Sequence, residues 1–235
     1  LYDVGITGKD WVGETNSDVE SILDLEYGKI RLVIAFPDKY TYKNLDAMIA
    51  DYGKKKKTLR ISSEYLRTAS TFIKGLKSYQ KYYGKKDPLI VTPWMRLGNN
   101  KDVQIHLSFG ATEAKPPEDV DAIMDVTETG TTLKQNKLKI VDEVLTSTAH
   151  LIVNKKSLKD PKKREKIFDM ITLIRGAVNG RKYLHIYLNV EEKNLKKLLS
   201  QMPSLKRPTI SPLSEDGWFG VNTVIKKEEF HKLIP

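Results

Sequence analysis

The alternation of short apolar runs with amphipathic segments constrains the fold of this chain most strongly. Lys29–Phe36 is an apolar run that stops at Pro37, as is typical of a buried strand. Asn44–Tyr52 follows with the spacing of a short helix. We expect further strands over Tyr2–Ile6, Thr58–Ser62, Pro88–Thr92, Val103–Phe109 and Ala149–Val153, and further helices over Glu64–Tyr82 and Pro161–Val178. Strands and helices that alternate across short turns predict open α/β sheets.

In open α/β sheets, ligands bind beyond the carboxyl ends of strands, where turns lead into helices. Three segments fit that location: Gly5–Asp10, Ile61–Glu64 and Thr127–Leu133. We expect them to line one cleft from several sides, although each alone is also compatible with ordinary turn chemistry.

The segment Asp121–Leu133 is the most specific of the chain, since it reads as an apolar strand, a threonine-rich turn and a helix start. Gly130 can take a positive φ angle and let the backbone fold around an anion. The first N–H groups of the helix are unpaired, and Thr129, Thr131 and Thr132 add hydroxyl donors. These groups predict a site for a phosphorylated sugar. The alternative is a junction whose threonines only cap the helix.

Two acidic residues, Asp125 and Glu128, lie within this segment. Both would repel a phosphate, so we expect them to serve sugar hydroxyls or a bound cation.

Composition excludes several other classes of protein. The chain has 235 residues, of which 40% are hydrophobic, enough for more than one domain. It has no cysteine, and its four histidines are scattered, which argues against a structural zinc site. No window resembles a membrane span or a signal peptide, so we expect a cytoplasmic protein without a membrane partner.

The net charge of +10 raises a nucleic-acid alternative. The lysine clusters, such as Lys54–Lys57 and Lys159–Lys166, are separated by mixed-charge segments and lack interleaved aromatic residues. We therefore expect solvated lysine-rich turns and no nucleic-acid partner.

The chain changes character after about residue 180, where two glycines end the long helix. We expect a strand over Tyr183–Val190, a helix over Glu191–Met202, strands over Thr209–Leu213 and Trp218–Lys226, and a helix from Glu228. This β-α-β-β-α order is that of a ferredoxin-like unit without its last strand.

Two motifs resemble the long form of the ATP phosphoribosyltransferase family. Asp3–Val12 (DVGITGKDWV) is similar to its amino-terminal element, and Asp121–Lys134 (DAIMDVTETGTTLK) is similar to its phosphoribosyl-pyrophosphate loop. Supporting matches are Leu59–Tyr65, Gly110–Glu113 and Ser204–Trp218. The family pattern has a further segment before Leu1, and residues 74–102 are longer here than in that pattern.

The resemblance implies an α/β fold with a two-domain catalytic core like that of periplasmic binding proteins. A carboxyl-terminal ferredoxin-like (βαββαβ) regulatory domain would follow, and we expect the chain to be truncated at both ends. We place catalytic domain I at residues 1–61, with a return segment over 155–180. Catalytic domain II would take 62–154 and carry the loop, and the incomplete regulatory domain would take 181–235.

The resemblance also implies a reaction. Adenine N1 of ATP would attack C1 of phosphoribosyl pyrophosphate, and magnesium pyrophosphate would leave, in the first step of histidine biosynthesis. Such a glycosyltransferase requires Mg²⁺, is inhibited by histidine and forms dimers that assemble into hexamers. The alternative is a non-catalytic two-domain protein that binds a small anion or nucleotide. Two acids at the rim of the loop favour the enzyme.

Site residues follow from the same motifs. The resemblance assigns phosphoribosyl pyrophosphate to Asp125, Val126, Thr127, Glu128, Thr129, Gly130, Thr131 and Thr132. Asp125 and Glu128 are the catalytic candidates, with Asp125 facing the ribose. Asp3, Thr7 and Gly8 are assigned to the nucleotide. Magnesium ligands are not assigned.

Overall fold

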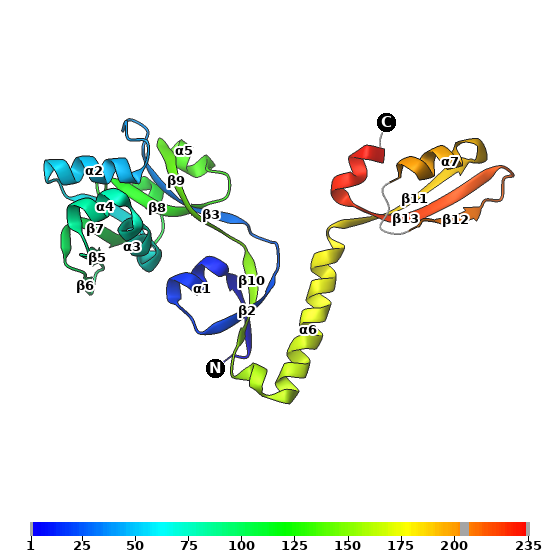
Figure 1. Cartoon of the computed structure of the whole chain (residues 1–235), viewed down its shortest axis with the longest axis horizontal. Helices are drawn as coiled ribbons and strands as arrows, with labels where there is room; N and C mark the ends of the chain where they lie inside the picture. The colour runs from blue at the N-terminus through cyan, green and yellow to red at the C-terminus, as the bar shows by residue number, and fades with distance from the viewer. Residues whose placement is uncertain (1, 203–206, 234–235) are drawn as a thin grey trace. The chain divides into compact units, whose positions relative to one another are not determined.

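The computed structural model describes residues 2–202 and 207–233. Residues 204–206, where the third supporting match begins, lie outside the described residues, as do the last two residues of the predicted 181–235 domain. The chain divides into two compact units, Leu1–Pro161 and Lys162–Pro235 (Figure 1).

The larger sheet of the first unit has seven strands in the order β6-β5-β7-β4-β8-β3-β9. These strands are β3 (Ile30–Pro37), β4 (Leu59–Ser63), β5 (Pro88–Val91), β6 (Arg96–Leu97), β7 (Asn100–Leu107), β8 (Ala122–Thr127) and β9 (Leu138–Ser147). The four neighbours β5, β7, β4 and β8 run parallel, so their carboxyl ends meet at one edge. Below, this edge is called the carboxyl edge.

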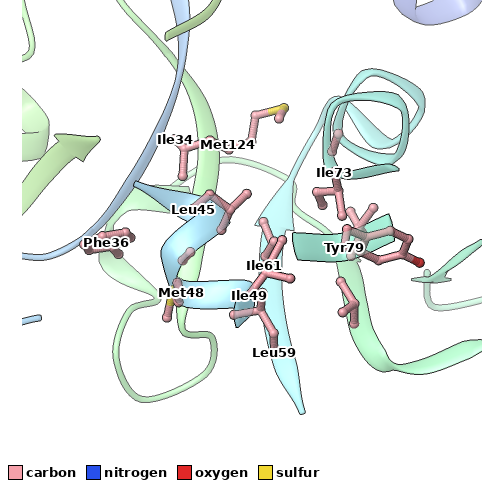
Figure 2. Packing of buried hydrophobic residues seen from close by; sticks show 14 of the residues in the cluster. Ile34, Phe36, Leu45, Met48, Ile49, Leu59, Ile61, Ile73, Tyr79 and Met124 are labelled. Atoms are coloured by element: carbon pink, nitrogen blue, oxygen red, sulfur yellow. The ribbon is translucent and has the colours of Figure 1, made fainter. Parts of the chain in front are cut away.

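Three helices cover one face of this sheet: α2 (Leu45–Lys55), α3 (Leu66–Gly75) and α4 (Lys77–Tyr83). Asn44 caps α2, because its side-chain oxygen accepts the Ala47 N–H at 2.9 Å. Figure 2 shows Leu45 and Ile49 of α2 packed against strand residues such as Ile61. Each fully buried aliphatic side chain of this kind contributes about 1.5–3 kcal/mol. A smaller cluster on the opposite face includes Leu133 of α5 (Thr131–Gln135).

A second sheet of the first unit has three antiparallel strands in the order β1-β10-β2. They are β1 (Val4–Gly8), β2 (Val19–Asp24) and β10 (Ala149–Asn154), and α1 (Lys9–Thr15) directly follows β1. The chain crosses between the two sheets twice, between β2 and β3 and at Thr148 between β9 and β10.

The pairing corrects the predicted boundary between residues 61 and 62, which would pass through β4. Both β3 and β4 pair with β8 in the larger sheet, and β3 also pairs with β9. The chain therefore passes from the smaller sheet to the larger one after β2, and returns to the smaller sheet at Thr148. The boundary was misplaced because it depends on pairing between strands that are far apart in sequence, which local sequence patterns do not reveal.

Several elements also differ from the expectation. The strands β2, β6 and β9 were not predicted. The predicted helix over Glu64–Tyr82 is two helices, because Leu76 adopts an extended conformation (φ −73°, ψ 138°) between α3 and α4.

The second unit begins in α6 (Pro161–Gly180), of which only Pro161 belongs to the first unit. The elements that follow are β11 (Tyr183–Glu191), α7 (Glu192–Gln201), β12 (Thr209–Pro212), β13 (Trp218–Lys226) and the 3₁₀ helix η3 (Lys227–Leu233). Its strands are antiparallel in the order β11-β13-β12. The predicted β-α-β-β order is confirmed, and the last predicted helix is a 3₁₀ helix. Within the described part of the chain, no helix is long and apolar enough to cross a membrane.

Candidate active site

Three turns emerge together at the carboxyl edge. β4 lies between β7 and β8, and Ser63 pairs with Leu107 on one side and with Met124 on the other. β4 and β7 end at Ser63 and Leu107, so the residues that follow them leave the sheet side by side, with about 4.8 Å between neighbouring strands. β8 continues to Thr127 while paired with β3, and its turn leaves the same edge after that residue. The Gly110 N–H donates to Glu64 Oε1 at 3.0 Å and ties two of the turns together.

The threonine-rich turn has the conformation that the sequence predicts at Gly130, with φ 82° and ψ 3°. The Gly130 N–H donates to Thr127 Oγ1 at 2.8 Å, and the hydroxyls of Thr129 and Thr131 lie 2.9 Å apart. Both of these hydroxyl-bearing residues are exposed, as is Thr132. The following helix α5 has five residues, so donors of the turn itself, rather than a long helix, define the rim.

Asp125 lies at the base of this turn and is partly buried. Its Oδ1 accepts the Val126 N–H at 2.8 Å. Burial raises the pKa of Asp125 to about 6; the carboxylates of Glu113 and Glu64 also raise this pKa, whereas the Val126 N–H and Lys115 oppose the shift. The carboxylates of Asp125, Glu113 and Glu64 thus concentrate negative charge in one region of the carboxyl edge. Such a region favours positive charge over a bare phosphate.

The remaining residues of the predicted loop lie at its outer side. Val126 and Glu128 are exposed. The Glu128 carboxylate forms no hydrogen bond or ion pair with any described residue. Within the described part of the chain, nothing holds this carboxylate away from a ligand.

Helix α1 of the smaller sheet is attached to the larger sheet beside this edge. Asp10 is buried, and its carboxylate accepts hydrogen bonds from the hydroxyls of Tyr65 (2.5 Å) and Ser147 (2.6 Å). The Glu14 carboxylate accepts the N–H groups of Arg67 and Thr68, each at 2.8 Å, at the start of α3. The predicted segment Gly5–Asp10 therefore reaches the turns at the carboxyl edge. Both residues lie in segments that resemble the family, Asp10 in Asp3–Val12 and Tyr65 in Leu59–Tyr65, but the sequence assigns no role to either, because their hydrogen bond joins positions 55 residues apart.

The three residues predicted to bind nucleotide are not brought together. Thr7 and Gly8 end β1 next to α1, but Asp3 precedes the strand, about 13 Å away at 3.3 Å per residue. Asp3 Oδ1 accepts the Ser157 hydroxyl at 2.6 Å, which anchors that end of the sheet. A Cβ at Gly8 would overlap Asp10 Oδ1, so packing also favours glycine at this position.

Among the residues that the structure describes, no group of three histidine or acidic side chains could hold a metal ion.

Comparisons with known proteins agree over both units. Residues 1–176 match the ATP phosphoribosyltransferase family, and residues 180–235 match the family described as HisG, C-terminal domain. Over an alignment of 240 residues that includes the whole chain, it is 38% identical to an ATP phosphoribosyltransferase of Solibacter usitatus and covers 72% of that protein. It is 36% identical to one from Pelodictyon phaeoclathratiforme, of which it covers 71%.

A solved structure shares the fold. The ATP phosphoribosyl transferase (HisG:HisZ) complex from Thermotoga maritima matches with a TM-score of 0.55 at 21% identity, over 75% of this chain and 70% of that one.

Proposed function

The chain belongs to the ATP phosphoribosyltransferase family, and on this premise we propose how its residues serve the reaction. The enzyme joins adenine N1 of ATP to C1 of phosphoribosyl pyrophosphate and releases pyrophosphate, the first step of histidine biosynthesis. The observation that carries the assignment of residues is the placement of the threonine-rich turn directly after β8, the strand that carries Asp125, at the carboxyl edge.

The turn would hold the 5′-phosphate. Thr129, Thr131 and Thr132 supply exposed hydroxyls, and Gly130 allows the tight backbone. Thr127 has a different role, because its hydroxyl already accepts the Gly130 N–H and so fixes the shape of the turn. Val126 would contribute through its backbone.

Asp125 and Glu128 would act on the ribose. When the bond between C1 and the pyrophosphate oxygen breaks, its electron pair leaves with pyrophosphate and positive charge develops at C1. Adenine N1 then donates its lone pair to C1. A carboxylate positioned beside C1 stabilises this charge more in the transition state than in the bound substrate. Since its pKa is about 6, Asp125 is mostly ionised above pH 7 and suits this role.

Magnesium fits the donors at this edge. Mg²⁺ is commonly held by one or two carboxylates together with substrate phosphates. Asp125 and the exposed Glu128 supply such oxygens, and the pyrophosphate supplies the remainder. When bound, the ion offsets negative charge on the leaving pyrophosphate.

ATP would approach from the wall formed by α1. Thr7 and Gly8 are our candidates for contact with the nucleotide. Asp3 was assigned with them, and its bond to Ser157 supports an indirect role through the position of β1.

The second unit would regulate the enzyme. We propose that histidine binds this ferredoxin-like unit and inhibits the reaction in a cytoplasmic homo-oligomer, either a dimer or a hexamer assembled from dimers. The match of residues 180–235 to the family's carboxyl-terminal domain supports this assignment.

The decisive test is Thr131→Val, measured by formation of phosphoribosyl-ATP from ATP, phosphoribosyl pyrophosphate and Mg²⁺. Loss of a hydrogen bond to a charged group costs about 1.5–3 kcal/mol, so kcat/KM should fall about 10- to 150-fold. The matched control is Thr58→Val. Thr58 is exposed and precedes β4, at the opposite edge of the sheet, so this variant should keep full activity. Normal turnover by Thr131→Val would reject the assigned role of the turn.

A further inference from the structure

Two exposed aromatic rings lie together near the carboxyl edge, and the roles above do not use them. Trp94 is 68% exposed and Phe109 is 71% exposed. Their ring centroids are 6.1 Å apart, with 46° between the ring planes. Large apolar side chains that gather at a protein surface commonly mark a binding site.

Trp94 is presented by a rigid turn between β5 and β6. The Thr92 N–H donates to the Met95 carbonyl and the Met95 N–H donates to Thr92 Oγ1, each at 3.0 Å. Pro93, inside this turn, has a fixed φ. The backbone position of Trp94 is therefore set before any ligand arrives.

Phe109 is held between two residues that are bonded to the end of β4. The Ser108 N–H donates to the Ser63 carbonyl at 3.0 Å, and the Gly110 N–H donates to Glu64 at 3.0 Å. Phe109 follows β7, which lies two strand spacings, about 10 Å, from the strand of Asp125. The Phe109 side chain and an adenine ring stacked on it together span such a distance, from the backbone after β7 to a ribose at Asp125.

We propose that Trp94 and Phe109 form the surface on which the adenine ring of ATP stacks. The inference rests on the proposed function, because N1 of that ring must reach C1 of the ribose beside Asp125. The rings are too close to admit a base between them, since this requires two contact distances of about 3.5 Å each. The base therefore stacks on the outer face of the pair, where both side chains are open to solvent.

The test is ATP binding by titration calorimetry with the full chain and the variants Trp94→Leu and Phe109→Leu. Stacking of a base on an aromatic side chain predicts ATP affinity about 5- to 150-fold weaker in each variant. Tripolyphosphate, which lacks the base, should bind all proteins equally. Phe109→Tyr keeps the ring and should retain ATP affinity. Tyr27→Leu is the matched control, because Tyr27 is 69% exposed and lies in the turn before β3.

Unchanged ATP affinity in both leucine variants would overturn the proposal. An equal loss of ATP and tripolyphosphate binding would also overturn it, since the effect would then not depend on the base. A changed sedimentation coefficient with unchanged ATP affinity would assign the pair to contact between copies of the chain instead. Failure of the proposed function is distinct: the unaltered chain would bind ATP through the two rings yet form no phosphoribosyl-ATP.

Discussion

Asp125→Asn should make the protein more stable and less active. Asparagine keeps the side-chain oxygen that accepts the Val126 N–H, so the substitution removes little besides the charge. Burial, with the carboxylates of Glu113 and Glu64, raises the pKa of Asp125 to about 6 in the folded protein. An aspartate in an unfolded chain titrates near about 3.9.

The direction in which stability changes with pH follows from proton uptake at Asp125. Between pH 4 and 6 the folded protein binds a proton at Asp125 that the unfolded chain does not, so stability falls as the pH rises through this range. Above pH 6 the full cost of the buried carboxylate is present. A difference of about 2 pKa units corresponds to about 3 kcal/mol as an upper bound. Since the carboxylate is partly exposed, solvent screening reduces this to about 1–2 kcal/mol.

The assay is urea unfolding of the unaltered chain and of Asp125→Asn at several values between pH 4 and pH 8. Asp125→Asn should be about 1–2 kcal/mol more stable at pH 7.5, with the advantage disappearing near pH 4. Phosphoribosyl-ATP formation should fall about 100-fold or more, as for loss of other transition-state charge stabilisers. Asp119→Asn alters an exposed carboxylate and controls for net charge. A less stable variant at pH 7.5, or an advantage that does not vary with pH, refutes the reasoning.

Three further predictions concern the turn, the attachment of α1 and the second unit. Gly130→Ala should cost about 1–2 kcal/mol in urea unfolding, because φ is 82° and the new Cβ would lie 3.3 Å from Ile140 Cδ1; unchanged stability contradicts this. Glu14→Ala removes the acceptor for the N–H groups that begin α3, so it should cost about 0.5–2 kcal/mol and speed hydrogen exchange at Arg67 and Thr68; unaltered exchange at both amides counts against it. Histidine at 100 times its Kd should stabilise the chain by about 2.7 kcal/mol and raise its melting temperature; calorimetry that detects no binding removes this prediction.

Local chemistry predicts much of the candidate site. The apolar run at 29–36 is β3, and the turn after 127 has glycine where a positive φ is required. The convergence of β4 and β8 follows from a general property of parallel strands, whose carboxyl ends share one edge.

Most of the features that the sequence does not predict depend on contacts between residues that are distant in sequence. β9 (Leu138–Ser147) carries Lys139, Asp142 and Glu143, because it is an edge strand with one partner, and these charges hide its pattern. The break at Leu76 does have a local signal, because Gly75 disfavours a continuous helix over Glu64–Tyr82. The raised pKa of Asp125 depends on Glu64 and Glu113 from two other turns, so the loop motif alone does not reveal it.

The position of β10 at the centre of the smaller sheet bears on biosynthesis. In the described chain, β1 and β2 form sheet hydrogen bonds only with β10. On the ribosome, all seven strands of the larger sheet are synthesised before β10 emerges. The larger sheet can therefore fold before the strand that pairs with both β1 and β2 in the described residues has been made. A nascent chain stalled before Ala149 would lack that shared partner, so the smaller sheet of the described residues assembles only at the end of the first unit's synthesis.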